Sequence, residues 1–589
     1  MAEAIISPGV YTNENDQSAV SQGPIVVGAA IVGPTVNGVP YVPTLVTTYS
    51  DYIAKFGTTF NNGTSGDMEY FTSIAAKNYF DNGGNTLLVT RITNAGTGSS
   101  ALSSFSSASV PSSGSLATSF VLETLAWGSQ MNNAGGTIVS GALPSGSALN
   151  VRWEVTNVDY TRGTFTLLVR SGNDNQAQKN ILETWTNLTM DVNQPNYIAR
   201  VIGNTKPVYT YSTADGQGYV DFVGDYANAS RYVRVASVPQ AQFNTINNNG
   251  VYVAATYSAS LPIAGSGSAN GTFNGGQVDT NLSRYMFENI TSGVSNAQGF
   301  TTADYAPALN LLNNADEYQF NLLLTPGLFL NGGNTAINIG ANSADPIAVA
   351  EGRADALAVV DPVPYGGSIV STTNASNASN SSYGATYWPW CQVFSSAMGK
   401  LVWVPASVVM GGVFAFNDEV SAPWFAPAGV TRGGIPNVVK VERKLSLNDR
   451  NTLYNDNVNP LATFPGEGVV VFGQKTLQQK ASALDRVNVR RLLIALKNYI
   501  AGVGRTLVFE QNTAVTRNRF LNQVNPYLDN VVQKQGLFAY KVVMDESNNT
   551  PDVVDRNQLI GQIYIQPTKT AEFIILDFNI LPTGVSFPA

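Results

Sequence analysis

The chain offers few side chains that could carry out catalysis, and the residue types it lacks decide which chemistry is open to it. Its 589 residues include no histidine and one cysteine, Cys391. Without imidazole there is no Ser-His-Asp or Cys-His catalysis, no histidine general base and no metal site built on histidine. A single thiol allows no internal disulfide, and its apolar neighbours predict that Cys391 is a small buried side chain. The sequence therefore predicts no metal site and no cofactor.

The remaining candidates for chemistry are acidic pairs, a glycine-rich stretch and a pair of arginines. Asp418-Glu419 and Asp545-Glu546 contain the carboxyl groups that a glycosidase needs, but adjacent residues seldom converge on one substrate. The phosphate-loop pattern GxxxxGK[ST] does not occur, and GVGRT at 502–506 follows a predicted helix, which indicates a turn that ends it. Arg490-Arg491 forms either a solvated helix face or a docking patch for an acidic partner. We therefore predict that the protein is not an enzyme.

Charge is scarce and unevenly distributed. Only 12% of residues are charged, so the surface is either neutral and polar or covered by partner molecules. Residues 1–384 carry 13 Lys and Arg against 25 Asp and Glu, whereas residues 385–589 carry 19 against 15. This asymmetry predicts that the two halves face different surroundings. No dense Lys/Arg stripe indicates nucleic-acid binding, and no signal peptide or long apolar run predicts secretion or membrane insertion.

Two segments show the pattern of an α/β fold. Residues 25–33 are predicted to be a buried strand and residues 86–92 another strand, with a helix between them that ends at Gly83-Gly84. After residue 317, FNLLLTPG, a helix from Asp345-Pro346 and LAVVDP form a β–α–β pattern typical of a parallel sheet. Further strands are predicted in WPWCQVFS and KLVWVPAS, with a crossover helix in SVVMGGVFAFND.

The middle and the end of the chain differ from these segments. Residues 95–114 contain nine serines, and the strands predicted beyond them indicate a β-rich insertion; 205–316 is predicted to be a second β region, and 371–382 is a low-complexity tract. A helix is predicted after a capping box at Ser482 and Asp485, and a second over 514–535. Three strands follow, the last with alternating apolar residues at Ile574, Leu576, Phe578 and Ile580.

Taken in order, these segments resemble the tail sheath proteins of contractile-tailed bacteriophages, of the long multi-domain kind. The resemblance is carried by SPGVYTNENDQS, VVGAAIVGP, VTTYSDYIAKFG, YFDNGGNTLLVTRI, YWPWCQVF, VPASVVMGGVFAFND, APWFAPAGVTRGG, LYNDNVNPLATFPGEGVVVFGQKTL and SALDRVNVRRLLIALKNYI. It covers roughly residues 1–95 and 317–589 and is weak over 96–316, where long sheath proteins carry variable outer domains.

The resemblance implies a mechanical function. Sheath subunits stack as hexameric rings around an inner tail tube, and contraction drives the tube through the host cell envelope. The implied partners are other copies of the chain, the tube protein, the baseplate and the tail terminator, with no nucleic acid. The implied location is the virion tail, after assembly in the host cytoplasm.

The resemblance also implies that terminal arms add strands to a sheet of adjacent subunits. The residues expected in this exchange are Pro8, Gly9, Val10 and Tyr11 in the N-terminal arm, Val542, Val543, Met544, Ile563, Tyr564 and Ile565 in a receiving hairpin, and Ile574, Leu576, Phe578 and Ile580 in the C-terminal arm. Arg490, Arg491 and Lys497 are the candidates for charged contacts with the lattice or the tube.

The expected fold is α/β plus β: a discontinuous inner α/β domain with a subtilisin-like sheet, and β-rich outer insertions. The expected division is an N-terminal arm (1–23), an α/β part of a middle domain (24–95), a β-rich outer insertion (96–204), a β-rich part of the middle domain (205–316), an α/β sheath core (317–535) and C-terminal strands with an arm (536–589). The main alternative is a β-rich tail-fibre or adhesin-like surface-binding protein, which the polar middle region favours. A sheath from a related contractile injection machine is a second alternative.

Overall fold

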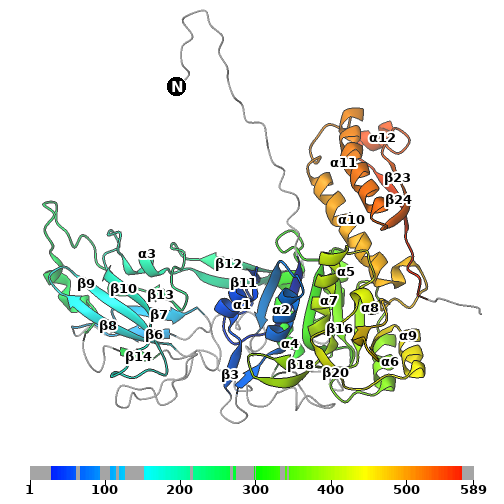
Figure 1. Ribbon diagram of the computed structural model, residues 1–589. Coiled ribbons are helices and arrows are strands. Elements are labelled where there is room, and N and C mark those ends of the chain that lie inside the picture. The colour runs from blue at the N-terminus through cyan, green and yellow to red at the C-terminus, as the bar shows by residue number, and fades with distance from the viewer. Residues whose placement is uncertain are drawn as a thin grey trace, which may run out of the picture.

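A computed structural model of the chain describes residues 28–61, 67–92, 107–114, 118–125, 151–212, 217–264, 270–272, 298, 300–331, 338–340 and 344–572. Figure 1 shows three neighbouring parts: a central α/β body, a β-rich part on one side of it, and a smaller part made of helices and a hairpin on the other side.

The central body is built on an eight-stranded sheet with the order β2-β5-β1-β15-β16-β17-β21-β22. Its strands are β1 (Ala29–Pro34), β2 (Thr44–Val46), β5 (Leu87–Ile92), β15 (Leu322–Phe329), β16 (Leu357–Asp361), β17 (Gly384–Trp388), β21 (Val458–Phe464) and β22 (Gly468–Val471). The strands from β5 to β21 are parallel, and β2 and β22 pair antiparallel at the two edges. Ala29 of β1 pairs with Leu87 on one side and with Leu322 on the other. The segments before residue 95 and after 317 therefore contribute to one sheet.

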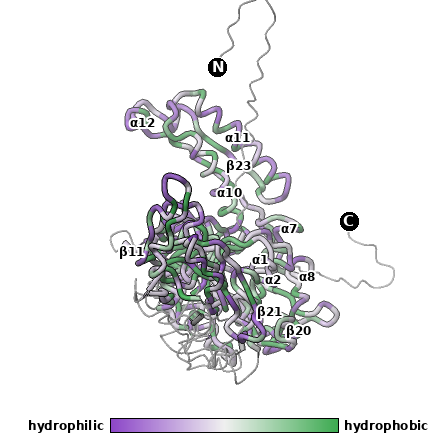
Figure 2. Tube along the Cα trace, turned by 90° about the vertical axis from the view of Figure 1, so that its left-hand side faces the viewer, coloured by the Kyte–Doolittle hydropathy of each residue, from purple (hydrophilic) through white to green (hydrophobic). Residues whose placement is uncertain are grey.

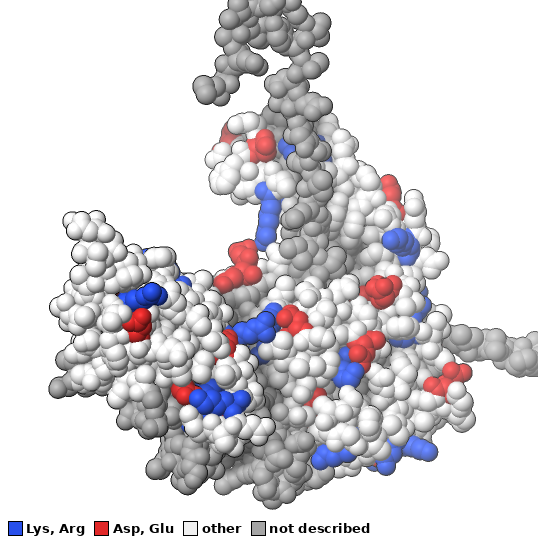
Figure 3. All heavy atoms as spheres, turned by 60° about the vertical axis from the view of Figure 1, so that its left-hand side comes forward, with Lys and Arg blue, Asp and Glu red and all other residues white. Residues whose placement is uncertain are grey.

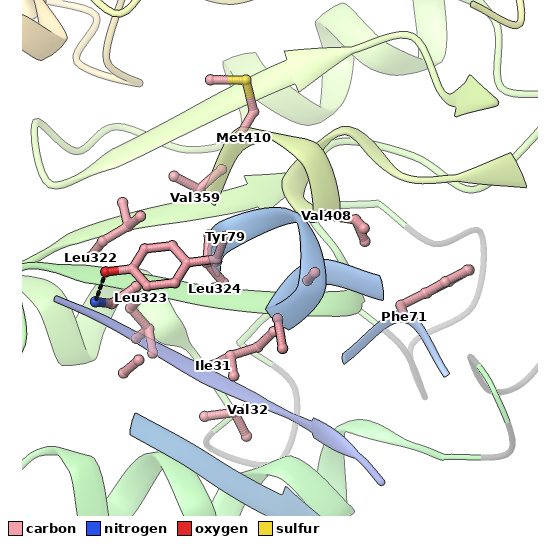
Figure 4. Close-up of a cluster of buried hydrophobic side chains, with 14 of the residues drawn as sticks. Ile31, Val32, Phe71, Tyr79, Leu322, Leu323, Leu324, Val359, Val408 and Met410 are labelled. Carbon is pink, nitrogen blue, oxygen red and sulfur yellow. Dashed lines mark hydrogen bonds between the residues drawn. The ribbon is translucent and has the colours of Figure 1, made fainter. Parts of the chain in front are cut away.

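Helices cover this sheet because its central strands are buried along their whole length. Helices α2 (Phe71–Asp81) and α7 (Ala406–Val420) pack against each other and against β15, and α4 (Thr302–Leu312) and α5 (Pro346–Arg353) form a second pair. Gly412 of α7 permits the close approach of α2, because a Cβ there would lie 2.8 Å from the carbonyl oxygen of Asn78. Figure 4 shows Tyr79 of α2 reaching over β15 to the start of β1, where the Ala29 N–H donates to its hydroxyl at 3.3 Å.

Shorter elements complete the central body. They are α1 (Tyr49–Phe56), α6 (Ile369–Asn377), α8 (Gly429–Arg432) and α9 (Leu447–Asn455), the β3–β4 pair (Thr59–Asn61 and Asp67–Glu69), and a sheet of β18 (Cys391–Ser395), β19 (Lys400–Val404) and β20 (Val438–Val441). Helix α6 differs from the low-complexity tract expected at 371–382. The Ser368 hydroxyl accepts a hydrogen bond from the Ser371 N–H, and Thr372, Ala375 and Ser376 are buried against the body. Tertiary packing therefore makes a helix out of residues that have weak intrinsic helix propensity.

The β-rich part has its own sheets and its own apolar cluster. One sheet contains β10 (Ile181–Thr189), β9 (Thr164–Ser171), β8 (Val151–Asp159) and β14 (Asn270–Thr272); another contains β13 (Val233–Ser237), β7 (Phe120–Thr124) and β6 (Ser107–Val110). The helix α3 (Ile198–Ile202) and a hairpin of β11 (Lys206–Ser212) and β12 (Gln217–Val223) follow β10. Phe120 and Phe165 stack in the core with ring centroids 5.5 Å apart.

Two observations differ from the expected division of the middle region. Strand β13 pairs with β7, so strands on both sides of the boundary at residue 204 form one sheet. Helix α4, within the region 205–316 that was expected to be β-rich, packs on β1 and β5 of the central sheet. Alternation within a strand predicts its type but not its pairing partner, which explains the first difference.

The third part contains α10 (Val487–Arg505), α11 (Ala514–Gln533), α12 (Pro551–Asp555) and an antiparallel hairpin of β23 (Leu537–Val543) and β24 (Gln562–Pro567). Helix α10 begins at Val487, because Ser482 caps a short 3-10 turn over Ala483–Asp485 instead. The turn expected at GVGRT is wrong, since α10 continues through Gly502 and Gly504. Each glycine costs a helix about 1 kcal/mol relative to alanine, and Val503 between them packs partly buried against the adjoining apolar cluster.

The cluster shared by α10, α11 and the hairpin runs across the boundary expected between residues 535 and 536. Figures 1 and 2, viewed from directions 90° apart, both show this part projecting from the central body. Among the described residues, no helix is both long enough and apolar enough to cross a membrane.

Candidate strand-exchange site

The projecting part carries the hairpin that the sequence predicted at its end. Val542 pairs with Ile563, Lys541 with Tyr564 and Tyr540 with Ile565, in antiparallel register. Five of the six predicted receiving residues, Val542, Val543, Ile563, Tyr564 and Ile565, lie in the two strands. Met544 follows β23 directly and is buried. The predicted receiving residues are therefore together in space.

One face of the hairpin packs on α11. Leu537 and Met544 are buried in the cluster with Val524 and Leu528 of α11, and Tyr540, Val542, Ile563 and Ile565 pack partly buried against it. The Tyr540 hydroxyl donates to the Asn525 carbonyl oxygen at 3.1 Å and to Asp529 Oδ1 at 2.7 Å. Burial and the neighbouring Asp529 carboxylate raise the pKa of Tyr540 to about 12, so it remains a donor at neutral pH. The hairpin is therefore held on a rigid helix.

Among the described residues, nothing pairs with either edge of the hairpin, and its other face is exposed. Phe538 is 79% exposed and Tyr564 57% exposed, and Lys541, Gln562 and Gln566 lie on the outer surface. Within the described part of the chain, neither β23 nor β24 has a second neighbouring strand. An edge strand with unpaired backbone N–H and C=O groups can pair with an added strand from another chain. This geometry suits β-augmentation.

The predicted donor strands cannot be placed. Pro8, Gly9, Val10 and Tyr11 lie outside the described residues, as do Ile574, Leu576, Phe578 and Ile580. Their role in strand exchange stays a prediction.

Two of the three predicted charged contacts, Arg490 and Arg491, are buried within the subunit. The Arg491 side chain is 3% exposed, and its guanidinium binds both carboxylate oxygens of Asp418 at 2.8 and 2.6 Å. The Arg490 guanidinium stacks over the Tyr383 ring with its carbon 3.9 Å from the centroid, and burial lowers the pKa of Arg490. Both arginines are bound inside the subunit because α10 turns that face inward, and their role between subunits stays a prediction. Lys497 is exposed beside the Tyr383 hydroxyl at 3.2 Å, and its predicted role is untested.

The aspartates and the cysteine considered for chemistry take part in ion pairs, local hydrogen bonds or the buried core. Asp418 binds Arg491, and Asp545 accepts hydrogen bonds from the N–H and hydroxyl of Ser547, which lower its pKa. Cys391 is fully buried, as predicted, and burial raises the pKa of its thiol. No cluster of His, Cys, Asp and Glu among the described residues could hold a metal ion. In Figure 3, charged side chains are scattered over a largely neutral surface instead of forming one patch.

Tyr540 and Asp529 are the residues of this site that the sequence analysis missed. The spacing of Tyr540 and Val542 on one face of β23 was the available signal, since it places the tyrosine beside the apolar residues that face α11. No local signal identifies Asp529 as its partner, because that pairing depends on how the hairpin lies across the helix.

Solved structures of sheath proteins align with the chain at TM-scores below 0.5. A sheath tail protein from Listeria innocua covers 92% of this chain and 95% of its own length at 10% identity, with a TM-score of 0.49. The helical sheath of the anti-feeding prophage in its contracted state covers 98% and 99% at 16% identity, with a TM-score of 0.47.

Two family models match adjoining segments of the chain. Residues 298–477 match the phage tail sheath protein central domain, and residues 479–581 match the phage tail sheath C-terminal domain, which includes the hairpin. The tail sheath proteins of Vibrio phage KVP40 and Enterobacteria phage T4 are 40% and 39% identical to it over 185 residues, which is 31% of this chain and 28% of each relative. The alignment thus covers less than a third of those relatives' length. The second half of the chain is thus similar to phage tail sheath proteins in their central and C-terminal domains.

Proposed function

We propose that the protein is the structural subunit of a contractile phage tail sheath, which polymerises as stacked hexameric rings around an inner tail tube and contracts to drive the tube through the host cell envelope. The observation that carries the proposal is the β23–β24 hairpin, seated on α11 with both edges open within the described residues. Its place in the matched C-terminal sheath domain supports the same function.

Strand exchange would link the subunits. The arm around Pro8–Tyr11 of one copy and the arm around Ile574–Ile580 of another would each add a strand to the hairpin of a third. Each added backbone hydrogen bond contributes about 0.5–1.5 kcal/mol, so a strand of five or six residues gives a modest tether. Head-to-tail contacts of this kind, repeated around a ring and along an axis, build an open filament.

Contraction in this proposal needs no bound nucleotide. The extended lattice is a kinetically trapped state, and its conversion releases energy stored during assembly. The low charge content suits interfaces that slide and re-form without burying an unpaired ion. We infer that the protein has no enzymatic activity of its own.

The proposed partners are other copies of this chain, the inner tube protein, the baseplate and the tail terminator, in a virion tail assembled in the host cytoplasm. The more basic half after residue 385 would face the tube, and the acidic half would face solvent. We further propose that the central sheet is the subtilisin-like inner domain of the family and that the β-rich part is an outer insertion. The separate apolar cores of the two parts support this division.

Negative-stain electron microscopy of the purified chain, beside a variant lacking residues 1–22, tests the proposal. Hollow striated tubes are expected from the full chain and not from the truncated one. Tubes from both would retain the sheath subunit but contradict the role of the N-terminal arm. Compact monomers from the full chain, even with tube protein added, would contradict the sheath function.

A further inference from the structure

The segment that follows the hairpin crosses from the projecting part back to the central body. The Thr568 N–H donates to the Gly536 carbonyl oxygen at 3.2 Å, and two residues later the Thr570 hydroxyl accepts from Gln474 Nε2 at 2.6 Å. In Figure 1 the chain descends from β24 along α10 toward the central body. The path ends, within the described residues, at Glu572, whose side chain is only 18% exposed.

Glu572 is bound by three side chains of the central body, and we call these four residues the Glu572 clamp. Arg486 donates through Nε to Oε1 at 2.7 Å and through Nη2 to Oε2 at 3.0 Å. The Tyr454 hydroxyl donates to Oε2 at 2.8 Å, and Gln474 Nε2 donates to Oε1 at 3.0 Å. Partial burial alone would raise the pKa of Glu572, but these hydrogen bonds outweigh burial and hold it below its usual range. The carboxylate is therefore ionised at neutral pH, and its bidentate pair with arginine is of the strong kind.

The three holding residues come from different elements that brace one another. Tyr454 lies in α9, Gln474 follows β22, and Arg486 directly precedes α10. The Val487 N–H donates to the Gln474 carbonyl oxygen at 2.8 Å, and Lys475 forms a β-bridge with Arg486. Arg486 also pairs with Asp485 at 3.1 Å. The clamp is thus a built site on the central body and not a chance contact between mobile side chains.

The position of the clamp determines which part of the subunit would bear tension on the C-terminal arm. Without it, tension on residues 573–589 would act first on the Thr568–Gly536 hydrogen bond next to Pro567, the end of β24, and would then open the hairpin one backbone hydrogen bond at a time. With it, tension reaches Glu572 first and passes into α9, β22 and the start of α10. Fully extended, residues 573–589 span roughly 55–60 Å, which is enough to leave the subunit.

We propose that the Glu572 clamp anchors the root of the C-terminal arm to the central body, so that force from the adjoining subunit bypasses the hairpin. This inference rests on the proposed sheath function, because it assumes that the arm is held by another copy of the chain. It assigns Glu572 and Arg486 a positioning role that is separate from the strands themselves.

Charge variants of the full-length chain test the clamp. The variants are Glu572→Arg, Arg486→Glu, the double swap of both, and the conservative Glu572→Gln, in case Arg486→Glu disturbs folding. Glu510→Arg is the matched control, because Glu510 is half exposed and pairs with Arg519 only at 3.8 Å. The first measurement, in the unassembled chain, is amide hydrogen exchange at the start of the segment 568–572, where the Thr568 N–H donates to the Gly536 carbonyl oxygen. The second is the urea resistance of assembled tubes.

We expect exchange in this segment to be about 10- to 100-fold faster in both single charge variants and faster to a smaller degree in Glu572→Gln. The double swap should recover most of the protection, and Glu510→Arg should match the wild type. Tubes of the single variants should fail to form or dissociate at lower urea, with recovery in the double swap.

Unchanged exchange in Glu572→Arg would overturn the anchor. If amide exchange were faster but the tubes resisted urea as well as the wild type, the proposal that force bypasses the hairpin would be overturned. Tubes with lower urea resistance that the double swap does not restore would overturn it as well. Absence of tubes from the wild type would count against the sheath function itself, while the exchange measurement would still decide the anchor.

Discussion

Replacing Asp418 by asparagine should destabilise the folded subunit, because it leaves the guanidinium of Arg491 buried without its carboxylate. Arg491 is 3% exposed, binds Asp418 through both oxygens and lies 4.8 Å from the centroid of the Phe414 ring. Breaking a buried ion pair by removing one partner costs 3–5 kcal/mol in general. Asp418 is 28% exposed, so we expect the lower end of that range, about 3 kcal/mol.

Thermal unfolding of the unassembled chain measures this effect. A loss of about 3 kcal/mol lowers the transition of a domain of 150–250 residues by roughly 6–12 °C. Asp316→Asn is the matched control: Asp316 is 89% exposed and pairs with Arg505, so its loss should cost less than about 1 kcal/mol.

The result also decides how Arg491 acts. If Asp418→Asn unfolded within a degree of the Asp316→Asn control, but formed tubes with altered salt dependence, the internal role of Arg491 would be refuted. The lattice contact expected from the sequence would then be restored.

Three further outcomes follow from the structure. Burial raises the pKa of Asp361 to about 7 against hydrogen bonds from Ser407, so the folded state holds a proton that the unfolded state releases between about pH 4 and 7. Stability from this group should fall as the pH rises through that window, and differential scanning fluorimetry should show the melting temperature of Asp361→Asn gaining on the wild type from pH 5 to 7.5; a constant difference would contradict this. Phe165→Ala should lower the free energy of unfolding of the β-rich part by about 3–5 kcal/mol, while electron microscopy should still show tubes. Lys541→Pro and Val542→Pro each remove one backbone N–H of β23. Because successive N–H groups of a strand point to opposite edges, one variant loses an N–H that faces β24 and the other loses an N–H on the outer edge. The variant that keeps the wild-type melting temperature should form no tubes, and tubes from it would contradict the use of the β23 edge.

The helices and strands of the central body could be predicted from the sequence wherever apolar residues recurred with a single helical or strand period. The helix α5 and the strands β15 and β16 occur where apolar runs and the Asp345-Pro346 start predicted a β–α–β unit, and α7 occurs where a crossover helix was predicted. The helix α6 could not be predicted from composition, although the Ser368 cap with Thr372, Ala375 and Ser376 at helical spacing was a usable signal.

Long-range pairing is what local patterns could not provide. The apolar pattern of residues 29–31 does not specify that they pair with Leu322–Leu324. Likewise, no local pattern distinguishes a buried arginine from an exposed one. Arg490-Arg491 was therefore expected on the surface, although α10 places both side chains inward. The two strands of the hairpin lie where the local pattern predicted them, and their receiving role stays a prediction. The partners Asp529 and Arg486, which hold the hairpin and the segment after it, were not predicted because their contacts are long-range.

The central claim is that the hairpin binds strands from other copies of the chain, and a cryo-electron microscopy reconstruction of assembled tubes tests it most directly. We predict that β23 and β24 become part of a larger sheet, with at least one added strand that connects to a neighbouring subunit. A hairpin that remains two-stranded in the tube, or whose added strands all connect to its own subunit, would contradict strand exchange as the link between subunits.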